Sequence, residues 1–214
     1  MSSAVYVVDD HPVVRRGFRS LVARQSDLEI CGEASSAGEA LEAIPEPGAD
    51  LVLVDVALEG MSGLELIKRL RQRDIDAEIL VISMHDEALY ADRALQAGAR
   101  GFVMKDESDE VMLEAMRTVL DGQVYLSPEM NTRALLGRLG GDENSELGTL
   151  TDRELEVFQE MGRGRPTQEI ADRLSISPRT VGTYYRNIRD KLEVESTDRL
   201  KVKAVLWYHG REGN

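Results

Sequence analysis

A single cysteine among 214 residues limits how this chain can be held together. One thiol cannot form an internal disulfide, so the stability of the fold must come from packed cores. Hydrophobic residues make up 42% of the sequence, which is enough for such cores and too much for general disorder. We expect the cysteine, Cys31, to be a buried small hydrophobe within a strand.

Long apolar runs are also missing from the sequence. None approaches the roughly 18 residues that a membrane helix needs, so we predict no membrane partner. The chain passes from Met1 almost directly into Val5–Val8 and then into two aspartates, which is not the pattern of a secretory signal peptide. We therefore expect the protein to be cytoplasmic.

Basic residues are scarce over most of the chain, whose formal net charge is −13. Residues 1–128 carry 12 basic against 24 acidic side chains, a net charge of −12, whereas residues 149–214 carry 12 against 11, a net charge of +1. This asymmetry indicates that the two parts meet different partners. The acidity that would argue against DNA binding therefore belongs to the first part.

The first 122 residues alternate short apolar runs with amphipathic stretches. The runs are rich in Val and Ile and suit buried parallel strands: Ala4–Val8, Leu28–Ala34, Leu51–Val54, Ile79–Ile82 and Gly101–Met104. The helical patterns between and after them cover Val13–Arg24, Ala37–Ile44, Leu64–Arg73, Ala88–Ala97 and Glu110–Leu120. Five repeats of strand and helix predict an α/β fold, a doubly wound five-stranded parallel sheet with helices on both faces.

The alternation of apolar runs and amphipathic stretches ends after Gly122. Residues 123–148 read as a linker, with a helix-start signal at Ser127–Glu129, a short helix over 131–139 and a polar break at Gly140–Ser145. From residue 150 the pattern is helical, and Thr151 with Glu154 three positions later forms a capping-box sequence. The four helices are expected over 152–161, 167–174, 178–192 and 197–208. The predicted domains are thus residues 1–122, the linker 123–148, and a small all-α domain over 149–214.

Polar side chains follow four of the five predicted strands: Asp9 and Asp10, then Asp55, Ser83 and Lys105. The carboxyl ends of parallel strands meet at one edge, where open α/β sheets collect function. Three carboxylates so close together would repel one another unless a hard cation such as Mg²⁺ lay among them. A carboxylate held in this way can accept a phosphoryl group, whose oxygens need cations and donors around them. Each aspartate alone would be read as a turn residue or helix cap. Their joint placement favours phosphoryl chemistry.

Four segments carry a family resemblance: Val7–His11, Val54–Asp55 with Gly60–Gly63, Val81–Ser83 and Gly101–Asp106. In order and spacing they resemble the signature blocks of receiver domains over about residues 3–121, which implies a flavodoxin-like fold with Asp55 as the phosphorylated residue. The resemblance also implies that Asp10, Asp55 and the Ala57 carbonyl hold Mg²⁺ directly, with Asp9 acting through water. It further implies that Ser83 and Lys105 contact the phosphoryl group and that Phe102 is the aromatic switch residue.

Several residues near these blocks need a separate interpretation. The family often has Met-Pro where this chain has Leu58–Glu59, and often has Tyr at the position of Phe102, which cannot make a hydroxyl hydrogen bond. We expect His11 and His85 to be surface residues rather than catalysts. Met84 and His85 follow Ser83 directly, where they would tune the access of water or of a kinase.

The last domain contains a helix-turn-helix pattern, formed by Gln168–Leu174, a turn at Ser175–Ser177, and Pro178–Leu192. Leu150–Val157, Glu169–Leu174, Ile176–Val181 and Lys191–Leu192 resemble the LuxR-type module, and with a receiver they are similar to the NarL/FixJ response regulators. The predicted DNA contacts are Arg179, Thr180, Gly182, Thr183, Arg186, Asn187, Arg189 and Lys191. The resemblance puts Gly182, Thr183 and Arg186 at base-facing positions, although Gly182 offers no side chain. Tyr184 and Tyr185 are adjacent. We expect one of them to pack in the core rather than to contact a DNA phosphate.

These patterns favour a two-component response regulator. A sensor histidine kinase would phosphorylate Asp55, and this would control sequence-specific binding of a homodimer to double-stranded DNA. The alternative is a receiver and DNA-binding protein that acts independently of phosphorylation. An aspartyl-phosphate phosphatase is disfavoured, because such enzymes place an Asp-x-Asp pair after the first strand and here Asp9 and Asp10 are adjacent. We therefore predict that the chain is not an enzyme.

Two further hypotheses concern regulation. Val202, Val205 and Leu206 recur at helical spacing in the last predicted helix, where they would either support dimerisation or cap the core of the small domain. The acidic receiver is expected to lie against the basic recognition helix, or to repel DNA near it, until phosphorylation releases it.

Overall fold

The computed structural model describes residues 2–44, 48–84, 87–137 and 145–212. The chain divides into two compact units, Met1–Gly141 and Asp142–Asn214, and each has its own set of buried apolar residues. Within the described residues, no helix is both long and apolar enough to cross a membrane.

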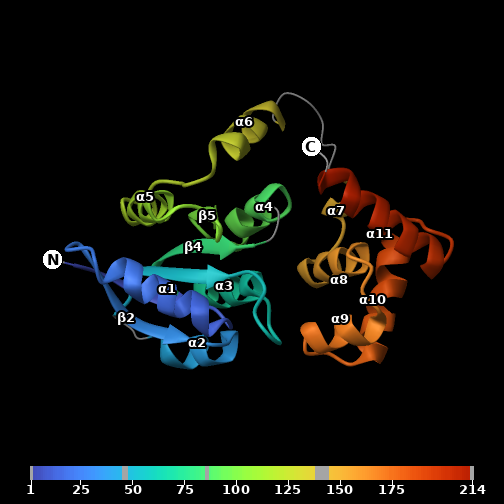
Figure 1. Cartoon of the computed structure of the whole chain (residues 1–214), viewed down its shortest axis with the longest axis horizontal. Coiled ribbons are helices and arrows are strands. Elements are labelled where there is room, and N and C mark those ends of the chain that lie inside the picture. Colours follow the sequence, from blue (N-terminus) through green and yellow to red (C-terminus); the bar gives the residue numbers. More distant parts are fainter. Residues whose placement is uncertain (1, 45–47, 85–86, 138–144, 213–214) are drawn as a thin grey trace. The chain divides into compact units, whose positions relative to one another are not determined.

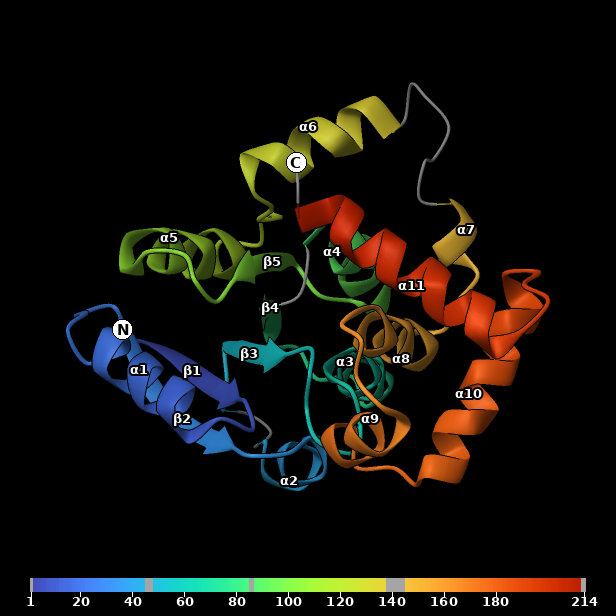
Figure 2. The same cartoon turned by 45° about the vertical axis from the view of Figure 1, so that its right-hand side comes forward.

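A five-stranded parallel sheet forms the centre of the first unit, in the order β2-β1-β3-β4-β5. Its strands are β1 (Ser3–Val8), β2 (Leu28–Ala34), β3 (Leu51–Asp55), β4 (Glu78–Ser83) and β5 (Gly101–Met104). The helices α1 (Pro12–Val22), α2 (Ala37–Ala43), α3 (Gly63–Gln72), α4 (Glu87–Ala97) and α5 (Asp109–Leu120) lie on both faces of the sheet (Figures 1 and 2). The predicted doubly wound α/β fold is confirmed, and every predicted strand agrees with its observed bounds to within one residue.

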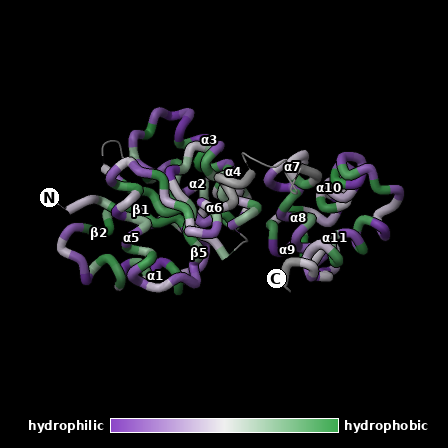
Figure 3. The backbone as a smooth tube through the Cα atoms, turned by 90° about the horizontal axis from the view of Figure 1, so that it is seen from above, coloured by the Kyte–Doolittle hydropathy of each residue, from purple (hydrophilic) through white to green (hydrophobic). Residues whose placement is uncertain are grey.

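Successive residues of each strand point to opposite faces of the sheet, and both faces are buried. On one face, Val5, Leu53 and Ile82 belong to a core with apolar residues of α1 and α5. Residues that alternate with them, such as Val54 and Phe102, are also fully buried. Because helices cover both faces, the strands other than the edge strand β2 read in the sequence as largely continuous apolar runs. Figure 3 shows hydrophobic residues gathered along these strands.

The residues that follow α5 remain attached to the edge of the sheet. Tyr125 forms a one-residue bridge to the start of β5. Its N–H donates to the Arg100 carbonyl over 3.2 Å, and its own carbonyl accepts from the Phe102 N–H over 3.0 Å. The unpaired outer edge of β5 is thereby partly covered by the chain that leads towards the second unit.

The predicted linker helix is present as α6 (Pro128–Gly137). It begins at the predicted start signal, three residues before the expected helix range, where the Ser127 hydroxyl accepts from the Met130 N–H over 3.1 Å. The Ser127 N–H in turn donates to the carboxylate of Glu87 at the start of α4, over 3.0 Å. Residues 138–144, which contain most of the predicted break at Gly140–Ser145, lie outside the described residues.

The elements of the second unit are all helices within residues 145–212, which agrees with the predicted all-α domain. The unit consists of a single turn, α7 (Ser145–Gly148), followed by α8 (Asp152–Gly162), α9 (Thr167–Arg173), α10 (Pro178–Lys191) and α11 (Thr197–Glu212). The capping box is confirmed: the Thr151 N–H donates to the Glu154 carboxylate, and the Glu154 N–H donates to the Thr151 hydroxyl. At Gly162, α8 comes so close to α11 that a Cβ would stand 2.7 Å from the Ala204 carbonyl oxygen.

The expectation that Cys31 is buried is wrong. Cys31 is exposed, and its strand, β2, lies at the edge of the sheet. Val5 pairs with Ile30 whereas Tyr6 pairs with Gly32, so Cys31 is the extra residue of a register shift. A residue left unpaired at such a bulge is not held to the inward face of the strand, which explains its exposure.

Candidate functional site

The polar residues predicted at the strand ends come together at the carboxyl edge of the sheet. Asp9 and Asp10 follow β1, Asp55 ends β3, Ser83 ends β4 and Lys105 follows β5. Asp9, Asp55 and Ser83 are buried. We call Asp9, Asp10 and Asp55 the acidic cluster.

Lys105 holds two members of this cluster together. Its Nζ lies 2.6 Å from Asp9 Oδ2 and 2.7 Å from Asp55 Oδ2, and its side chain is only 7% exposed. The Lys105 N–H donates to the Ser83 carbonyl over 2.8 Å, which fixes the backbone from which this ammonium projects. A single buried cation therefore faces two buried carboxylates.

The surroundings of Asp55 resist its ionisation. Burial raises the pKa of the Asp55 carboxyl, and the nearby Asp9 carboxylate also raises it, whereas Lys105 and the Ala57 N–H oppose the rise without cancelling it. The Ala57 N–H reaches Asp55 Oδ1 over 3.3 Å. A carboxylate in this setting needs another cation nearby if it is to serve as a nucleophile.

The segment after β3 is shaped to fit closely against Asp55. The Gly63 N–H donates to the Val56 carbonyl over 2.9 Å, and a Cβ at Gly63 would stand only 1.9 Å from the Asp55 carbonyl oxygen. Ser62 starts α3 at this point, because its hydroxyl accepts from the Glu65 N–H over 3.3 Å. The glycine recognised in the sequence is therefore required by the approach of α3 to the backbone of Asp55.

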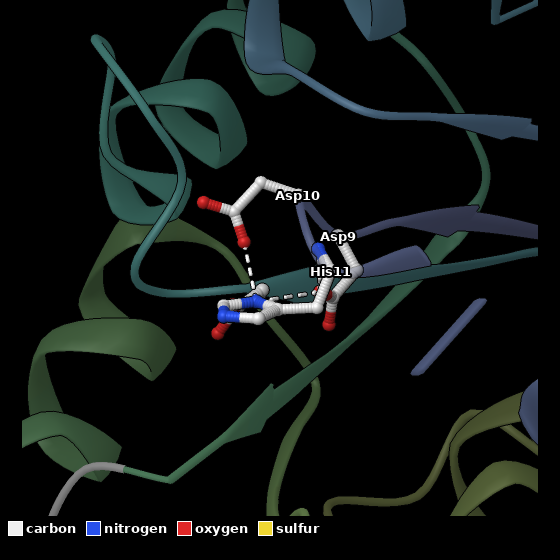
Figure 4. Close-up of side chains that lie close together, drawn as sticks. Asp9, Asp10 and His11 are labelled. Carbon is white, nitrogen blue, oxygen red and sulfur yellow. Dashed lines mark hydrogen bonds and ion pairs between the residues drawn. The ribbon is translucent and has the colours of Figure 1, made fainter. Parts of the chain in front are cut away.

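His11 contacts the acidic cluster, which the sequence did not foresee. Its side chain is 66% exposed, as expected of a surface residue. Its Nδ1 nevertheless lies 2.5 Å from Asp10 Oδ1 and 3.3 Å from Asp9 Oδ1 (Figure 4). The one signal for this contact was the position of His11 directly after the two aspartates.

The acidic cluster fits a divalent cation. One ligand atom from each of Asp9, Asp10, His11 and Asp55 lies within 4.8 Å of the others. Three carboxylates against the one ammonium of Lys105 leave two negative charges, which one dication would neutralise. Carboxylate oxygens are also the ligands that Mg²⁺ prefers.

Other residues singled out near this site have different surroundings. Phe102 is fully buried within β5, and Ala57 is half-buried beside Asp55. Met84, directly after Ser83, is 63% exposed. His85 lies outside the described residues.

In the second unit, α9 and α10 form the predicted helix-turn-helix. After α9, Ser175 takes a left-handed φ of 50°, and the Ile176 N–H donates back to the Ala171 carbonyl over 2.9 Å. Ser177 then caps α10, since its hydroxyl accepts from the Thr180 N–H over 3.1 Å. This tight turn places α10, the second helix of the motif, at the surface of the unit.

Most of the predicted DNA contacts lie on the exposed face of α10: Arg179, Gly182, Thr183, Arg186 and Asn187. The other three side chains have partners within the unit, and so has Thr183, whose hydroxyl donates to the Arg179 carbonyl over 3.2 Å. The Thr180 hydroxyl lies 2.8 Å from that of Ser177, Arg189 pairs with Asp190 over 3.0 Å, and Lys191 Nζ pairs with Glu154 over 2.6 Å. Of the tandem tyrosines, Tyr185 is buried and Tyr184 half-buried, so the prediction that one packs in the core is confirmed.

The last helix has an apolar stripe on its surface. Val202 is 59% exposed and Leu206 is 69% exposed, one turn apart on α11, whereas Leu200 and Ala204 are fully buried. The hypothesis that all three residues cap the core is therefore wrong for Val202 and Leu206, whereas Val205 between them is half-buried. Because the side chains of Val202 and Leu206 are exposed, the other hypothesis stands as a prediction: they form a surface that contacts a second copy of the chain.

Family comparisons agree with this architecture. Residues 5–117 match the response regulator receiver domain, and residues 148–204 match the bacterial regulatory proteins of the luxR family. The chain therefore belongs to the response regulators of the NarL/FixJ type, in which a receiver precedes a LuxR-type DNA-binding domain.

Individual relatives extend the match over nearly the whole chain. The nitrate/nitrite response regulator protein NarP of Escherichia coli strain K12 is 34% identical over 209 residues, which cover 98% of this chain and 95% of that protein. The transcriptional activator protein ExaE of Pseudomonas putida is 39% identical over 205 residues, with 94% and 95% covered. The crystal structure of ChrA, a response regulator of a heme-sensing two-component system, has a TM-score of 0.53 at 29% identity and covers 96% of this chain and 98% of that one.

Proposed function

We propose that Asp55 accepts a phosphoryl group from a sensor histidine kinase and that this modification controls DNA binding by α10. The observation that carries the proposal is the placement of Lys105 Nζ, 2.7 Å from Asp55 and 2.6 Å from Asp9, where the strands end. A buried nucleophile, a second carboxylate and an ammonium in contact are the parts that phosphoryl transfer to a carboxylate requires.

The transfer is a simple displacement. A carboxylate oxygen of Asp55 attacks the phosphorus, the bond from phosphorus to the histidine nitrogen of the kinase breaks, and the imidazole leaves with the electron pair. Lys105 then pairs with one phosphoryl oxygen, and the Ser83 hydroxyl donates to another. Asp10, Asp55 and the Ala57 carbonyl would hold Mg²⁺, with Asp9 as a further partner, and the ion would supply positive charge to the phosphoryl oxygens.

The connection from this site towards the linker runs through β5. Ser83 and Lys105 respond directly to the new phosphoryl group, and Phe102 lies in the strand that Lys105 follows. The Phe102 N–H donates a hydrogen bond to the carbonyl of Tyr125. Tyr125 lies in the segment that leads into α6. A rearrangement of Phe102 would therefore act on the first residues of the linker, which is a route from phosphorylation to the second unit.

DNA binding is assigned to the exposed face of α10. Arg179, Thr183 and Arg186 lie on that face and would reach base edges and phosphates in the major groove. A homodimer would pair two such helices on two half-sites, with Val202 and Leu206 of α11 in the contact between copies. Because the proposed partners are operator DNA and a sensor kinase that must both reach this chain, we propose a cytoplasmic location.

The proposal is tested by incubating the full chain with a small phosphodonor such as acetyl phosphate. The mass of the chain before and after incubation is then measured by mass spectrometry. One phosphoryl group should be added with Mg²⁺ present, and none with EDTA or in Asp55→Asn. Asp50→Asn is the matched control, because Asp50 precedes the other end of the same strand and is exposed. Labelling that persists in Asp55→Asn would refute the assignment of the phosphoacceptor.

The same samples test the alternative of phosphorylation-independent DNA binding. If phosphorylation controls the protein, operator affinity should rise on labelling in the parent chain and in Asp50→Asn, but not in Asp55→Asn. Equal operator affinity before and after complete labelling would favour the alternative.

A further inference from the structure

We propose that Gly182 leaves a gap in the row of side chains on the exposed face of α10, between Arg179 and Arg186, and that this gap takes the 5-methyl group of a thymine in the major groove. The inference rests on the proposed binding of DNA by α10. It goes beyond that proposal by naming a base and the residue that selects it.

The fold itself does not require a glycine at position 182. Gly182 lies in the interior of α10, its φ is outside the left-handed region, and a Cβ there would meet nothing within 4 Å. Glycine within a helix is less favourable than alanine, because its backbone loses more conformational freedom on folding. The unit therefore loses stability at Gly182 without gaining a contact of its own. Glycine is typical of places where a backbone comes close to a ligand, and position 182 faces outwards.

The residues around Gly182 give the gap apolar sides. Residues three and four positions apart are neighbours on a helix surface, so Gly182 is bordered by Arg179 one turn earlier and by Arg186 one turn later. Thr183 lies beside it, and its hydroxyl donates back to the Arg179 carbonyl over 3.2 Å. That bond leaves the methyl as the uncommitted end of the Thr183 side chain. The gap thus has the Gly182 Cα at its base, with this methyl and the aliphatic stems of the two arginines around it.

The two bordering arginines are suited to hold α10 against DNA. Among the described residues, neither the Arg179 nor the Arg186 guanidinium has a hydrogen-bond or ion-pair partner, whereas Arg189 pairs with Asp190. Exposed guanidinium groups without carboxylate partners can contact phosphates or guanine edges. Seven residues separate the two along α10, which is about 10 Å of helix and about three base-pair steps of DNA. Contacts from both arginines would place the Gly182 gap over the base pairs between them.

The chemistry of the gap favours thymine over the other bases. Backbone N–H and carbonyl groups inside a helix are bonded to each other, so the base of the gap offers no free donor or acceptor. In the major groove, the 5-methyl group of thymine is the apolar group that distinguishes one base from the rest. Cytosine presents an amino donor and the purines present N7 acceptors, and the gap could not replace the hydrogen bonds that these groups make with water. A thymine methyl is therefore the group that gains most from entering the gap.

The experiment begins with a selection of DNA duplexes from a randomised pool by the full chain after incubation with acetyl phosphate. Each thymine of the enriched half-site is then replaced by uracil, which lacks only the 5-methyl group, and affinities are measured by fluorescence anisotropy at one salt concentration. At one thymine the parent chain should prefer thymine to uracil by about fourfold, the worth of one buried methyl group. In Gly182→Leu, whose side chain fills the gap, this preference should fall below about twofold. The variant should also unfold at a higher urea concentration than the parent, because leucine favours a helix.

Gly17→Leu is the matched control, because Gly17 is an exposed glycine of α1 in the first unit where a Cβ also meets nothing within 4 Å. It should keep the fourfold preference. A preference that is unchanged in Gly182→Leu, or a parent chain that binds thymine and uracil equally at every position, would overturn the inference and leave DNA binding by α10 intact. If no sequence is enriched, or if Arg186→Ala binds the enriched duplex as tightly as the parent, the assignment of DNA binding to α10 fails and the inference fails with it.

Discussion

Replacing Gly63 by alanine is expected to damage both the stability of the receiver and its phosphorylation. The added Cβ would stand 1.9 Å from the Asp55 carbonyl oxygen and 2.8 Å from the carbonyl carbon. Because non-bonded carbon and oxygen need about 3 Å or more, the start of α3 and the end of β3 must separate by about 1 Å. Overpacking of this kind costs about 1–3 kcal/mol. A displacement of about 1 Å at a reacting group can cost about 100-fold in rate.

The assay combines urea unfolding of the full chain with the initial rate of labelling by acetyl phosphate. Gly17→Ala is the matched control, because Gly17 lies within α1 and a Cβ there meets nothing within 4 Å. That variant should gain about 1 kcal/mol from helix propensity and keep the parent labelling rate. The reasoning would be refuted if Gly63→Ala unfolded at the same urea concentration as the parent and was labelled at the parent rate.

Three other predictions concern the second unit. Burial alone would raise the pKa of Glu154, but hydrogen bonds from Lys191 and Thr151 outweigh it and hold that pKa below its ordinary value of 4.5. The ionised Glu154 carboxylate therefore contributes its full stabilisation above about pH 4.5. This contribution is lost as the pH falls through the pKa of Glu154 in the folded state. Glu154→Gln should cost about 1 kcal/mol in urea unfolding at pH 7 and less at pH 4, and a loss that grew in acid would contradict this. Val202→Glu should leave the fold intact in circular dichroism but abolish cooperative binding to an operator with two half-sites; normal cooperativity would exclude this surface from the dimer. Fragment 149–214 should bind DNA more tightly than the unphosphorylated chain, with log affinity falling against log salt at a slope of about −0.9 per phosphate contact; equal affinities at every salt concentration would rule out autoinhibition.

The location of the candidate site could be predicted because parallel strands share a direction. Asp55 and Lys105 are far apart in the sequence, but each stands at the carboxyl end of its strand, and topology brings such ends together. Their apolar flanks identified the strands, so the meeting of the two residues at one edge of the sheet followed from the sequence, whereas their direct contact over 2.7 Å is an observation of the structure. The capping residues were predictable for a similar reason, since Thr151 and Glu154 act over three positions of one chain.

Other features depend on contacts that no local pattern encodes. The exposure of Cys31 results from a register shift between two strands. Arg71 is half-buried, and its guanidinium donates to the carbonyls of Ile75, Ala77 and Gly98 over 2.8, 2.9 and 3.0 Å. It thereby ties the end of α3 to the end of α4. In the sequence, this residue is one more charge on an amphipathic helix.

The bridge at Tyr125 bears on where the receiver ends. A strand edge with open N–H and carbonyl groups is a template for pairing with another chain, and proteins usually cover or interrupt such edges. Here Tyr125, which lies three residues after Gly122, covers part of the β5 edge through two backbone hydrogen bonds. A receiver cut at Gly122 would lose that cover and expose the edge to self-association, whereas one that continues through α6 would keep it. The first residues of the linker thus also protect the sheet from aggregation.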